Sequence, residues 1–296
     1  MESPILIIHP GALGDVLQAV PALRGLRART PGATLVFAGQ SRLGRLLVAL
    51  GVVDEARAFD GLGLEALFTD GPIPPALAEW LGGFARVVSW FGAREPIYRA
   101  RLGALAAELT VARPVPDDET PVWRHLLATL SLGDFVETDS VAPIRLPARP
   151  PGASAVVVHA GSGGAWKQWP PERFAEAIGE VTARHAVAVV VHQGPADRAA
   201  VDALLARLDH PVERLVEPEL PALAAILSGA RTYLGGDSGI SHLAAAVGAP
   251  SVVLFPPAHL PRWSPWSPSA RPVAMTGDET PRVIRELERL LSSASR

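Results

Sequence analysis

The sequence contains no cysteine, and the patterns that usually hold a metal ion are missing as well. The lack of cysteine excludes disulfides and thiolate metal sites, and it is compatible with a reducing compartment. No two aspartates are separated by a single residue, and no two histidines lie three or four residues apart. Side chains at such spacings are a usual signature of a bound divalent ion. We therefore expect a site that works without a metal, and no motif predicts an organic cofactor.

An excess of positive charge is also absent. The chain carries 27 basic and 30 acidic residues, which gives a formal net charge of −3. Proteins that bind nucleic acid usually carry a concentrated basic face, so we expect no nucleic-acid partner. Only one of the 27 basic residues is a lysine, Lys167. This bias indicates either a site that requires a compact ammonium group in place of a planar guanidinium, or chance.

Long apolar segments are scarce. Near the amino terminus, Glu2 stands where an export signal carries basic residues, and the apolar run 5–8 is too short for such a signal. The longest uncharged stretch, 243–257, is interrupted by Gly248 and Pro250, as expected of a helix followed by a strand. The sequence therefore predicts no transmembrane segment and a cytoplasmic protein.

Short apolar runs alternate with helical patterns along the whole chain. The predicted strands occupy residues 5–8, 35–38, 87–90, 155–158, 187–191, 232–234 and 251–255. Their apolar character is continuous rather than alternating, which is typical of parallel strands that are covered on both faces. The segments between them show the spacing of amphipathic helices, one of which covers 16–26. This alternation predicts an α/β fold built on doubly wound parallel sheets.

A proline-rich segment, 143–152, divides the pattern into two similar halves. Its prolines favour an extended connector over a helix or a central strand. We therefore predict an amino-terminal domain over residues 1–150 and a carboxyl-terminal domain over residues 151–296. The last predicted helix, at about 280–291, either crosses back onto the first domain or presents its apolar face to a partner.

Glycine-containing loops follow several of these strands, at the edge where ligands of such sheets bind. In the first loop, Gly11 and Gly14 allow a tight turn. Asp15 stands at the start of the next helix, where a capping role is the simpler interpretation. In the second loop, 159–169, three glycines accompany a lysine and a serine. This composition favours a phosphate cradle, and the alternative is an exposed loop.

Two further loops carry acidic side chains. The loop 235–239 leads into a helix, whose first N–H groups and dipole favour an anion. In it, Asp237 either caps the helix or supports the residues that contact the anion, and His242 either binds a phosphate or packs. Asp197 follows another strand, where it either accepts hydrogen bonds from a ribose or caps the next helix.

The three glycine-rich loops resemble the signatures of glycosyltransferase family 9, the bacterial heptosyltransferase family of lipopolysaccharide assembly. The similar segments are 11–27, 159–176 and 235–250, in the order in which the family carries them. The resemblance implies a GT-B fold, in which two Rossmann-like domains face each other across a cleft and the carboxyl-terminal domain binds the donor. It also implies an enzyme that transfers a sugar with inversion and without a metal, typically heptose from ADP-heptose. The implied acceptor is a lipopolysaccharide-core or related glycan or glycolipid, in the cytoplasm or at the inner-membrane surface.

The resemblance further implies roles for individual residues. Asp15 matches the family's general base, with Gly11 and Gly14 beside the reacting centre. Lys167 matches the lysine that binds the donor phosphates. The other expected donor-site residues are Ser162, then Asp197 facing the nucleoside, and Asp237, Ser238, Gly239, Ile240 and His242 in the diphosphate-binding turn and helix.

The chain departs from the family pattern after the strand 251–255. A turn similar to Gly-Pro-Thr is expected there, and the sequence reads Pro-Pro-Ala-His over 256–259. One hydroxyl that would contact the donor is therefore missing at Ala258. On the acceptor side, Arg94, Arg99 and Arg101 either meet an anionic acceptor or form a solvated face, and the solvated face is the simpler interpretation.

Two other functions suit the same pattern. A nucleotide-sugar epimerase on this fold needs its acid and base within the donor site, where the candidates are Asp197, Asp237 and His242. A non-catalytic nucleotide-sugar-binding protein needs no such groups, since a fold does not guarantee an activity.

Overall fold

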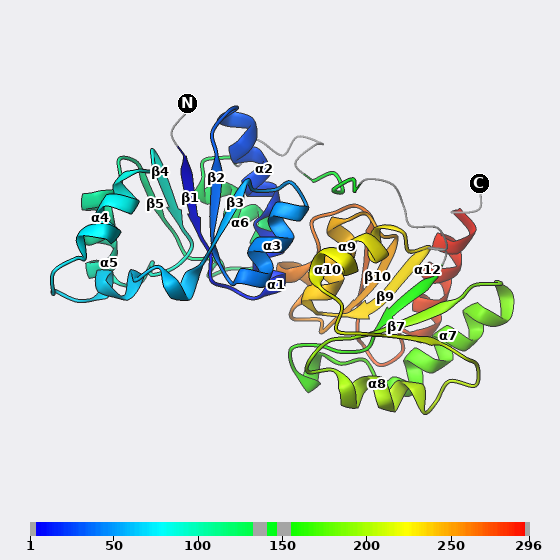
Figure 1. The fold of residues 1–296 in the computed structure, drawn as a ribbon. Coiled ribbons are helices and arrows are strands. Elements are labelled where there is room, and N and C mark those ends of the chain that lie inside the picture. Colours follow the sequence, from blue (N-terminus) through cyan, green and yellow to red (C-terminus); the bar gives the residue numbers. More distant parts are fainter. Residues whose placement is uncertain (1–3, 133–140, 147–154, 294–296) are drawn as a thin grey trace. The chain divides into compact units, whose positions relative to one another are not determined.

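The computed structural model describes residues 4–132, 141–146 and 155–293, and Figure 1 shows its fold. The chain divides into two compact units, Met1–Ser140 and Val141–Arg296. Each unit has its own parallel sheet and its own hydrophobic core. The predicted domain boundary at residue 150 falls in the segment 147–154, which lies outside the described residues.

Unit 1 is built on a five-stranded parallel sheet in the order β3-β2-β1-β4-β5. Its strands are β1 (Ile5–Ile8), β2 (Leu35–Gly39), β3 (Glu55–Ala58), β4 (Arg86–Ser89) and β5 (Leu109–Val111). Its helices are α1 (Leu13–Gln18), α2 (Val20–Arg29), α3 (Ser41–Ala49), α4 (Pro75–Gly82), α5 (Pro96–Leu105) and α6 (Val122–Thr129). Strand β1 is buried along its whole length, because helices and neighbouring strands cover both of its faces.

One predicted helix is in fact two. The apolar pattern over 16–26 predicts a single helix, whereas α1 ends at Gln18 and α2 begins at Val20. Pro21 explains the break, because proline has no N–H to donate to the carbonyl of Leu17 and its ring crowds that carbonyl. The chain therefore restarts its helix with proline in the first turn, where no donor is needed.

Unit 2 is built on a six-stranded parallel sheet in the order β11-β10-β9-β6-β7-β8. Its strands are β6 (Val156–His159), β7 (Val189–Gln193), β8 (Glu213–Val216), β9 (Thr232–Gly236), β10 (Ser251–Phe255) and β11 (Ala270–Ala274). Its helices are α7 (Pro171–Arg184), α8 (Arg198–Leu205), α9 (Leu220–Ser228), α10 (Gly239–Ala246), α11 (Leu260–Trp263) and α12 (Thr280–Ser293). The two sheets are therefore doubly wound and parallel throughout, as predicted.

The last helix, α12, packs within unit 2, where it lies against α7 (Figure 1). Val283, Leu287 and Leu291 on its apolar face are at most 1% exposed. They join the same core as Phe174 and Val181 of α7. The apolar face of α12 thus packs on α7 within unit 2.

Candidate functional site

The order of the strands brings the loops of unit 2 together. Strands β7 and β8 follow β6 towards one edge of the sheet, and strands β10 and β11 follow β9 towards the opposite edge. The direction reverses between β6 and β9, which are hydrogen-bonded neighbours. The loops that leave the carboxyl ends of two such strands diverge, and this switch point is where doubly wound sheets bind their ligands.

Lys167 and Asp237 meet at this switch point. The Nζ of Lys167, in the loop after β6, lies 3.0 Å from the Oδ2 of Asp237, in the loop after β9. The same oxygen lies 2.8 Å from the Nδ1 of His259, in the turn after β10. The Asp237 side chain is only 6% exposed, so these two partners compensate a buried carboxylate. The sequence pattern predicts both Lys167 and Asp237 as donor-site residues, whereas His259 enters only through the structure.

Helix α10 begins beside this cluster. Its N-cap is Ser238, whose hydroxyl accepts a hydrogen bond from the N–H of Ser241, so the suggested capping role of Asp237 is wrong. The N–H groups of Gly239 and Ile240, in the first turn, have no carbonyl within the helix to bond. The dipole of the helix adds positive potential at the same end. The first turn of α10 therefore offers donors and positive potential next to Lys167 and Asp237.

His242, in the next turn of α10, is 4% exposed. Burial lowers its pKa to about 4, although the nearby Asp237 opposes this effect, and the ring is therefore neutral near pH 7. Among the described residues, its Nδ1 is buried without a hydrogen-bond partner. His242 thus packs in the core and also keeps one unsatisfied polar atom at the start of α10.

Asp197 closes the turn after β7 and also supports the loop after β6. Its Oδ2 accepts a hydrogen bond from the N–H of Gly194, 2.9 Å away, and the side chain makes no cap bond to α8. A Cβ on Gly161 would lie 2.0 Å from the Oδ1 of Asp197, so only glycine fits against this carboxylate. Asp197 therefore ties two neighbouring loops of the site together.

Two buried histidines lie beneath these loops, and the sequence pattern did not mark them. The Nδ1 of His159 and the Nδ1 of His192 are 3.0 Å apart, at the carboxyl ends of β6 and β7. Burial lowers the pKa of each ring to about 4. Both rings are therefore neutral near pH 7, with one Nδ1–H donating to the other nitrogen.

The end of the lysine loop is anchored to the start of α12. Trp169 donates its indole N–H to the Oε1 of Glu279 at 2.6 Å, and Arg173 donates to the same oxygen at 2.7 Å. The other oxygen accepts from the N–H groups of Thr276 and Gly277. Burial alone would raise the pKa of Glu279, but these hydrogen bonds lower it to about 2. The buried carboxylate of Glu279 thus fixes the position at which the loop of Lys167 returns to the core.

We expect Glu279→Gln to lower the free energy of unfolding by about 3 kcal/mol at pH 7, because it removes one partner of a buried ion pair. Since the pKa of Glu279 is lowered from 4.5 to about 2, its contribution is present above pH 4.5 and is lost as the pH falls towards 2. Urea unfolding of both proteins across this range should show the difference shrinking as the pH falls. A difference that stays constant with pH would contradict the role of the charge, and the exposed Glu172→Gln is the matched control.

In unit 1, Asp15 lies at the third position of α1. Its Oδ2 accepts a hydrogen bond from the N–H of Ala12 at 2.9 Å, so the capping interpretation is confirmed. Gly11 packs closely here, since a Cβ on it would lie 2.7 Å from the ring of His9 and 3.0 Å from the Cβ of Asp15. Gly14 stands at the second position of the helix. The loop after β1 is therefore compact, and Asp15 is held at the switch point of the first sheet, between β1 and β4.

The side chain of Ser162 forms a hydrogen bond within its own loop. Its hydroxyl donates to the carbonyl oxygen of Gly164 at 2.7 Å. The neighbouring Trp166 is 62% exposed, and its ring lies 5.3 Å from the Nζ of Lys167 and 4.7 Å from the ring of His259. An exposed tryptophan thus flanks Lys167 and His259.

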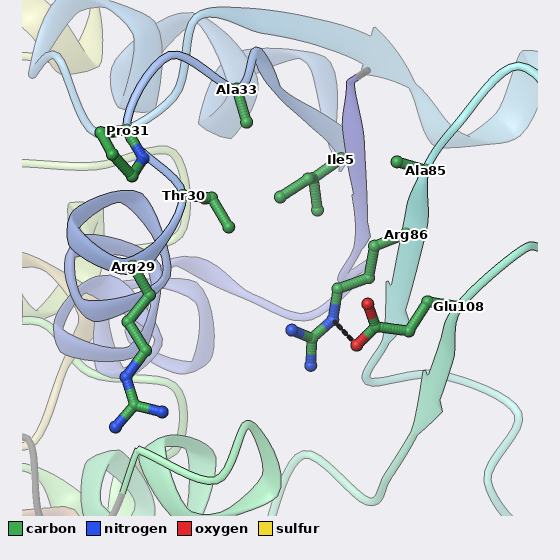
Figure 2. Close-up of a pocket in the computed structure, with 8 residues that line it drawn as sticks. All are labelled: Ile5, Arg29, Thr30, Pro31, Ala33, Ala85, Arg86 and Glu108. Carbon is green, nitrogen blue, oxygen red and sulfur yellow. Dashed lines mark ion pairs between the residues drawn. The ribbon is translucent and has the colours of Figure 1, made fainter. Parts of the chain in front are cut away.

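Unit 1 has cavities at both edges of its sheet. One cavity of about 340 Å³ lies at the amino ends of β1 and β4, where Arg86 forms an ion pair with Glu108 (Figure 2). This edge is opposite to the one where ligands of such sheets bind. The other cavity, of about 250 Å³, lies at the carboxyl ends of β4 and β5 and is lined by Arg94 and Arg113. The second cavity is on the edge that carries Asp15.

Neither a metal-binding group of side chains nor a helix suited to a membrane is found in the part of the chain that the structure describes. In residues 4–132, 141–146 and 155–293, no group of three or more histidine, aspartate or glutamate side chains is arranged to hold a metal ion. In the same part of the chain, no helix combines the length and the hydropathy that a membrane crossing requires.

Solved structures with the same fold include three glycosyltransferases. A glycosyltransferase family 9 protein from Veillonella parvula is 16% identical with a TM-score of 0.78, and 99% of this chain aligns with 98% of that one. The Escherichia coli ADP-heptose lipopolysaccharide heptosyltransferase II is 20% identical with a TM-score of 0.74, and the alignment covers 99% of this chain and all of that one. E. coli heptosyltransferase WaaC, solved with ADP, is 18% identical with a TM-score of 0.72. The alignment covers 98% of this chain and 99% of that one. The two units therefore form a GT-B fold.

Sequence comparison supplies the family. No curated protein sequence matches this chain significantly. The sequence model of glycosyltransferase family 9 (heptosyltransferase) matches residues 130–288, which is more than half of the chain. The matched segment contains the lysine loop and the turn into α10. The chain therefore belongs to glycosyltransferase family 9, the heptosyltransferase family, and is a glycosyltransferase.

Proposed function

We propose that this enzyme transfers heptose from ADP-heptose, with inversion and without a metal ion, onto a lipopolysaccharide-core or related glycan acceptor. The observation that carries the proposal is the meeting of Lys167, Asp237 and the first turn of α10 at the switch point of unit 2. A nucleoside diphosphate is an anion that needs both N–H donors and positive charge. This arrangement supplies both from residues of the chain itself.

On the donor side, each group would act on a different part of the leaving diphosphate. The ammonium of Lys167 would neutralise charge on the phosphates, and the N–H groups of Gly239 and Ile240 would bond their oxygens. Such preorganised positive groups stabilise the charge that develops on a leaving group, which is the work that a divalent ion does in other transferases. Asp237 would keep the ammonium in place.

On the acceptor side, we assign Asp15 as the general base. Inversion at the sugar carbon requires the acceptor oxygen to attack from the face opposite the leaving diphosphate, and a carboxylate must take its proton. The hydrogen bond from the N–H of Ala12 would hold one carboxylate oxygen in place. The carboxylate would then accept the proton of the acceptor hydroxyl.

The second cavity of unit 1 suits an anionic acceptor. Arg113, which pairs with Asp117, and the exposed Arg94 both line this cavity. Two guanidinium groups at a cavity are a common way to bind a phosphate or a carboxylate. A lipid-linked glycan that carries such groups would be modified at the inner-membrane surface. Of the other expected arginines, Arg101 donates to the carbonyl of Gly71 and so supports a loop.

We expect Arg94→Ala to raise the KM for the acceptor about tenfold, because one charged hydrogen bond to an anion contributes roughly 1.5 kcal/mol. The affinity for the donor should stay unchanged, since Arg94 belongs to unit 1. Steady-state kinetics with each substrate varied in turn measures both effects. Arg99→Ala, an exposed arginine of α5 outside the cavity, is the control. A KM that does not change in the Arg94 variant would contradict the acceptor site.

The donor is tested by thermal unfolding with ADP, UDP, GDP and CDP. A bound ligand stabilises the folded protein by RT ln(1 + [L]/Kd), which is about 2.7 kcal/mol at a hundredfold excess over Kd. We expect the largest rise in Tm with ADP, and no dependence of that rise on chelator. A preference for another base would contradict ADP-heptose as the donor. No rise with any of the four would contradict the donor site.

A further inference from the structure

The turn after β10 presents an imidazole to the donor-site cluster. Ala258 has no hydroxyl, and the next residue is His259. The N–H of His259 donates to the carbonyl of Pro256 at 2.8 Å, which closes the turn. Its side chain is 26% exposed. The polar side chain that this turn offers at the edge of the site is therefore the imidazole of His259.

The ring of His259 is held by groups from two other loops. Its Nδ1 lies 2.8 Å from the Oδ2 of Asp237, in the loop after β9. The ring of Trp166, in the loop after β6, packs against it with the two planes at 85°. The strands β10, β9 and β6 are consecutive in the sheet, so the three loops share one edge. This edge also carries Lys167, bonded to the same oxygen of Asp237.

The contact with Asp237 determines which ring nitrogen remains available. A carboxylate only accepts hydrogen bonds, so the Nδ1 of His259 must carry the proton of this bond. The Nε2 has no hydrogen-bond partner among the described residues. In the neutral ring this nitrogen is an acceptor, which cannot bond a phosphate oxygen. It becomes a donor only when the ring takes up a second proton.

Charged groups of both signs lie around His259. The carboxylate of Asp237 contacts the ring, and the ammonium of Lys167 contacts the same carboxylate oxygen. His242 in α10 is buried and neutral, and Arg262 in α11 adds a further positive charge to the element that follows the turn. A diphosphate bound at Lys167 would add negative charge to this cluster and favour the protonated ring.

We propose that His259 is a second cationic ligand of the donor's diphosphate, which it binds as an imidazolium through Nε2–H. This inference rests on the proposed function of the same site. The ring takes one proton from solvent onto Nε2 when the nucleotide binds, and it returns that proton when the nucleoside diphosphate leaves. His259 would thus share the charge of the leaving group with Lys167.

The test is calorimetric titration of the full-length protein with ADP, and with UDP, GDP and CDP if ADP does not bind. Titration at pH 8 in two buffers of different ionisation heat gives the number of protons taken up on binding. The proposed bond needs a second proton on the ring, so we expect an uptake of up to one proton on binding. His259→Asn keeps an amide N–H for Asp237 but lacks Nε2. In this variant we expect no uptake and a Kd at least tenfold higher.

The outcomes separate the inference from the proposed function. His185→Asn, at the end of α7, is the control and should keep both the wild-type Kd and the proton uptake. Binding by the wild-type protein without proton uptake would overturn the inference and leave the donor site standing, and this measurement needs no variant to fold. An unchanged Kd in the His259→Asn variant would likewise overturn the inference and leave the donor site standing. A protein that binds none of the four nucleotides would overturn the proposed function and the inference together.

Discussion

Replacing Asp15 by asparagine should lower kcat by a factor of about 10²–10⁴, the range that a positioned general base contributes. The variant keeps an amide oxygen that can accept the hydrogen bond from the N–H of Ala12, so α1 should form as before. It cannot take a proton from the acceptor hydroxyl. The loss should therefore appear in kcat, with little change in the affinity for the donor.

Single-turnover kinetics and nucleotide titration measure these two quantities separately. The matched control is Asp70→Asn, an exposed carboxylate in the same unit, which should be fully active. An Asp15→Asn enzyme with unchanged turnover would remove the proposed role of Asp15 and leave the capping role as the whole account of this residue.

Replacing Lys167 by alanine should raise the Kd for the nucleoside diphosphate by about 10- to 100-fold, since a hydrogen bond to a charged group contributes roughly 1.5–3 kcal/mol. The substitution has a second effect. It leaves the carboxylate of Asp237, which is 6% exposed, with the ring of His259 as its remaining side-chain hydrogen-bond partner among the described residues. The negative charge of Asp237 would then oppose the binding of an anion.

A double variant distinguishes the two effects. Lys167→Ala with Asp237→Asn removes the uncompensated carboxylate, so it should recover part of the stability lost in the single variant. It should not recover the wild-type affinity, because the ammonium is still missing. Arg198→Ala, whose side chain is 82% exposed, controls for the general loss of positive charge. Full-strength binding by the Lys167→Ala protein would contradict the phosphate-binding role.

The sequence predicts the interior of both sheets and misses their edges. The seven predicted strands correspond to β1, β2 and β4 in unit 1 and to β6, β7, β9 and β10 in unit 2. The four strands without a prediction are β3, β5, β8 and β11, which are the edges. An edge strand is covered on fewer sides, so it does not need a continuous apolar run. The strand Glu55–Ala58 carries two charged residues in four and is largely exposed.

The candidate site was predictable as separate loops but not as an arrangement. Glycines and polar residues after apolar strands mark Lys167 and Asp237, which are far apart in the chain. Their contact depends on β6 and β9 being neighbours, and this follows from the strand order rather than from either loop. His259 was visible only as a departure from a family turn. Its role depends on the side chain of Asp237, which no local pattern contains.

The most direct test of the whole account is the reaction itself, with ADP-heptose and a lipopolysaccharide core truncated before its first heptose. We predict that the acceptor gains the mass of one heptosyl residue, that one ADP is released for each residue transferred, and that NMR shows the inverted anomeric configuration in the product. The reaction should proceed in the presence of a chelator. Conversion of the donor to free ADP and an epimerised sugar without any change in the acceptor would contradict the account, as would a product that retains the anomeric configuration of the donor.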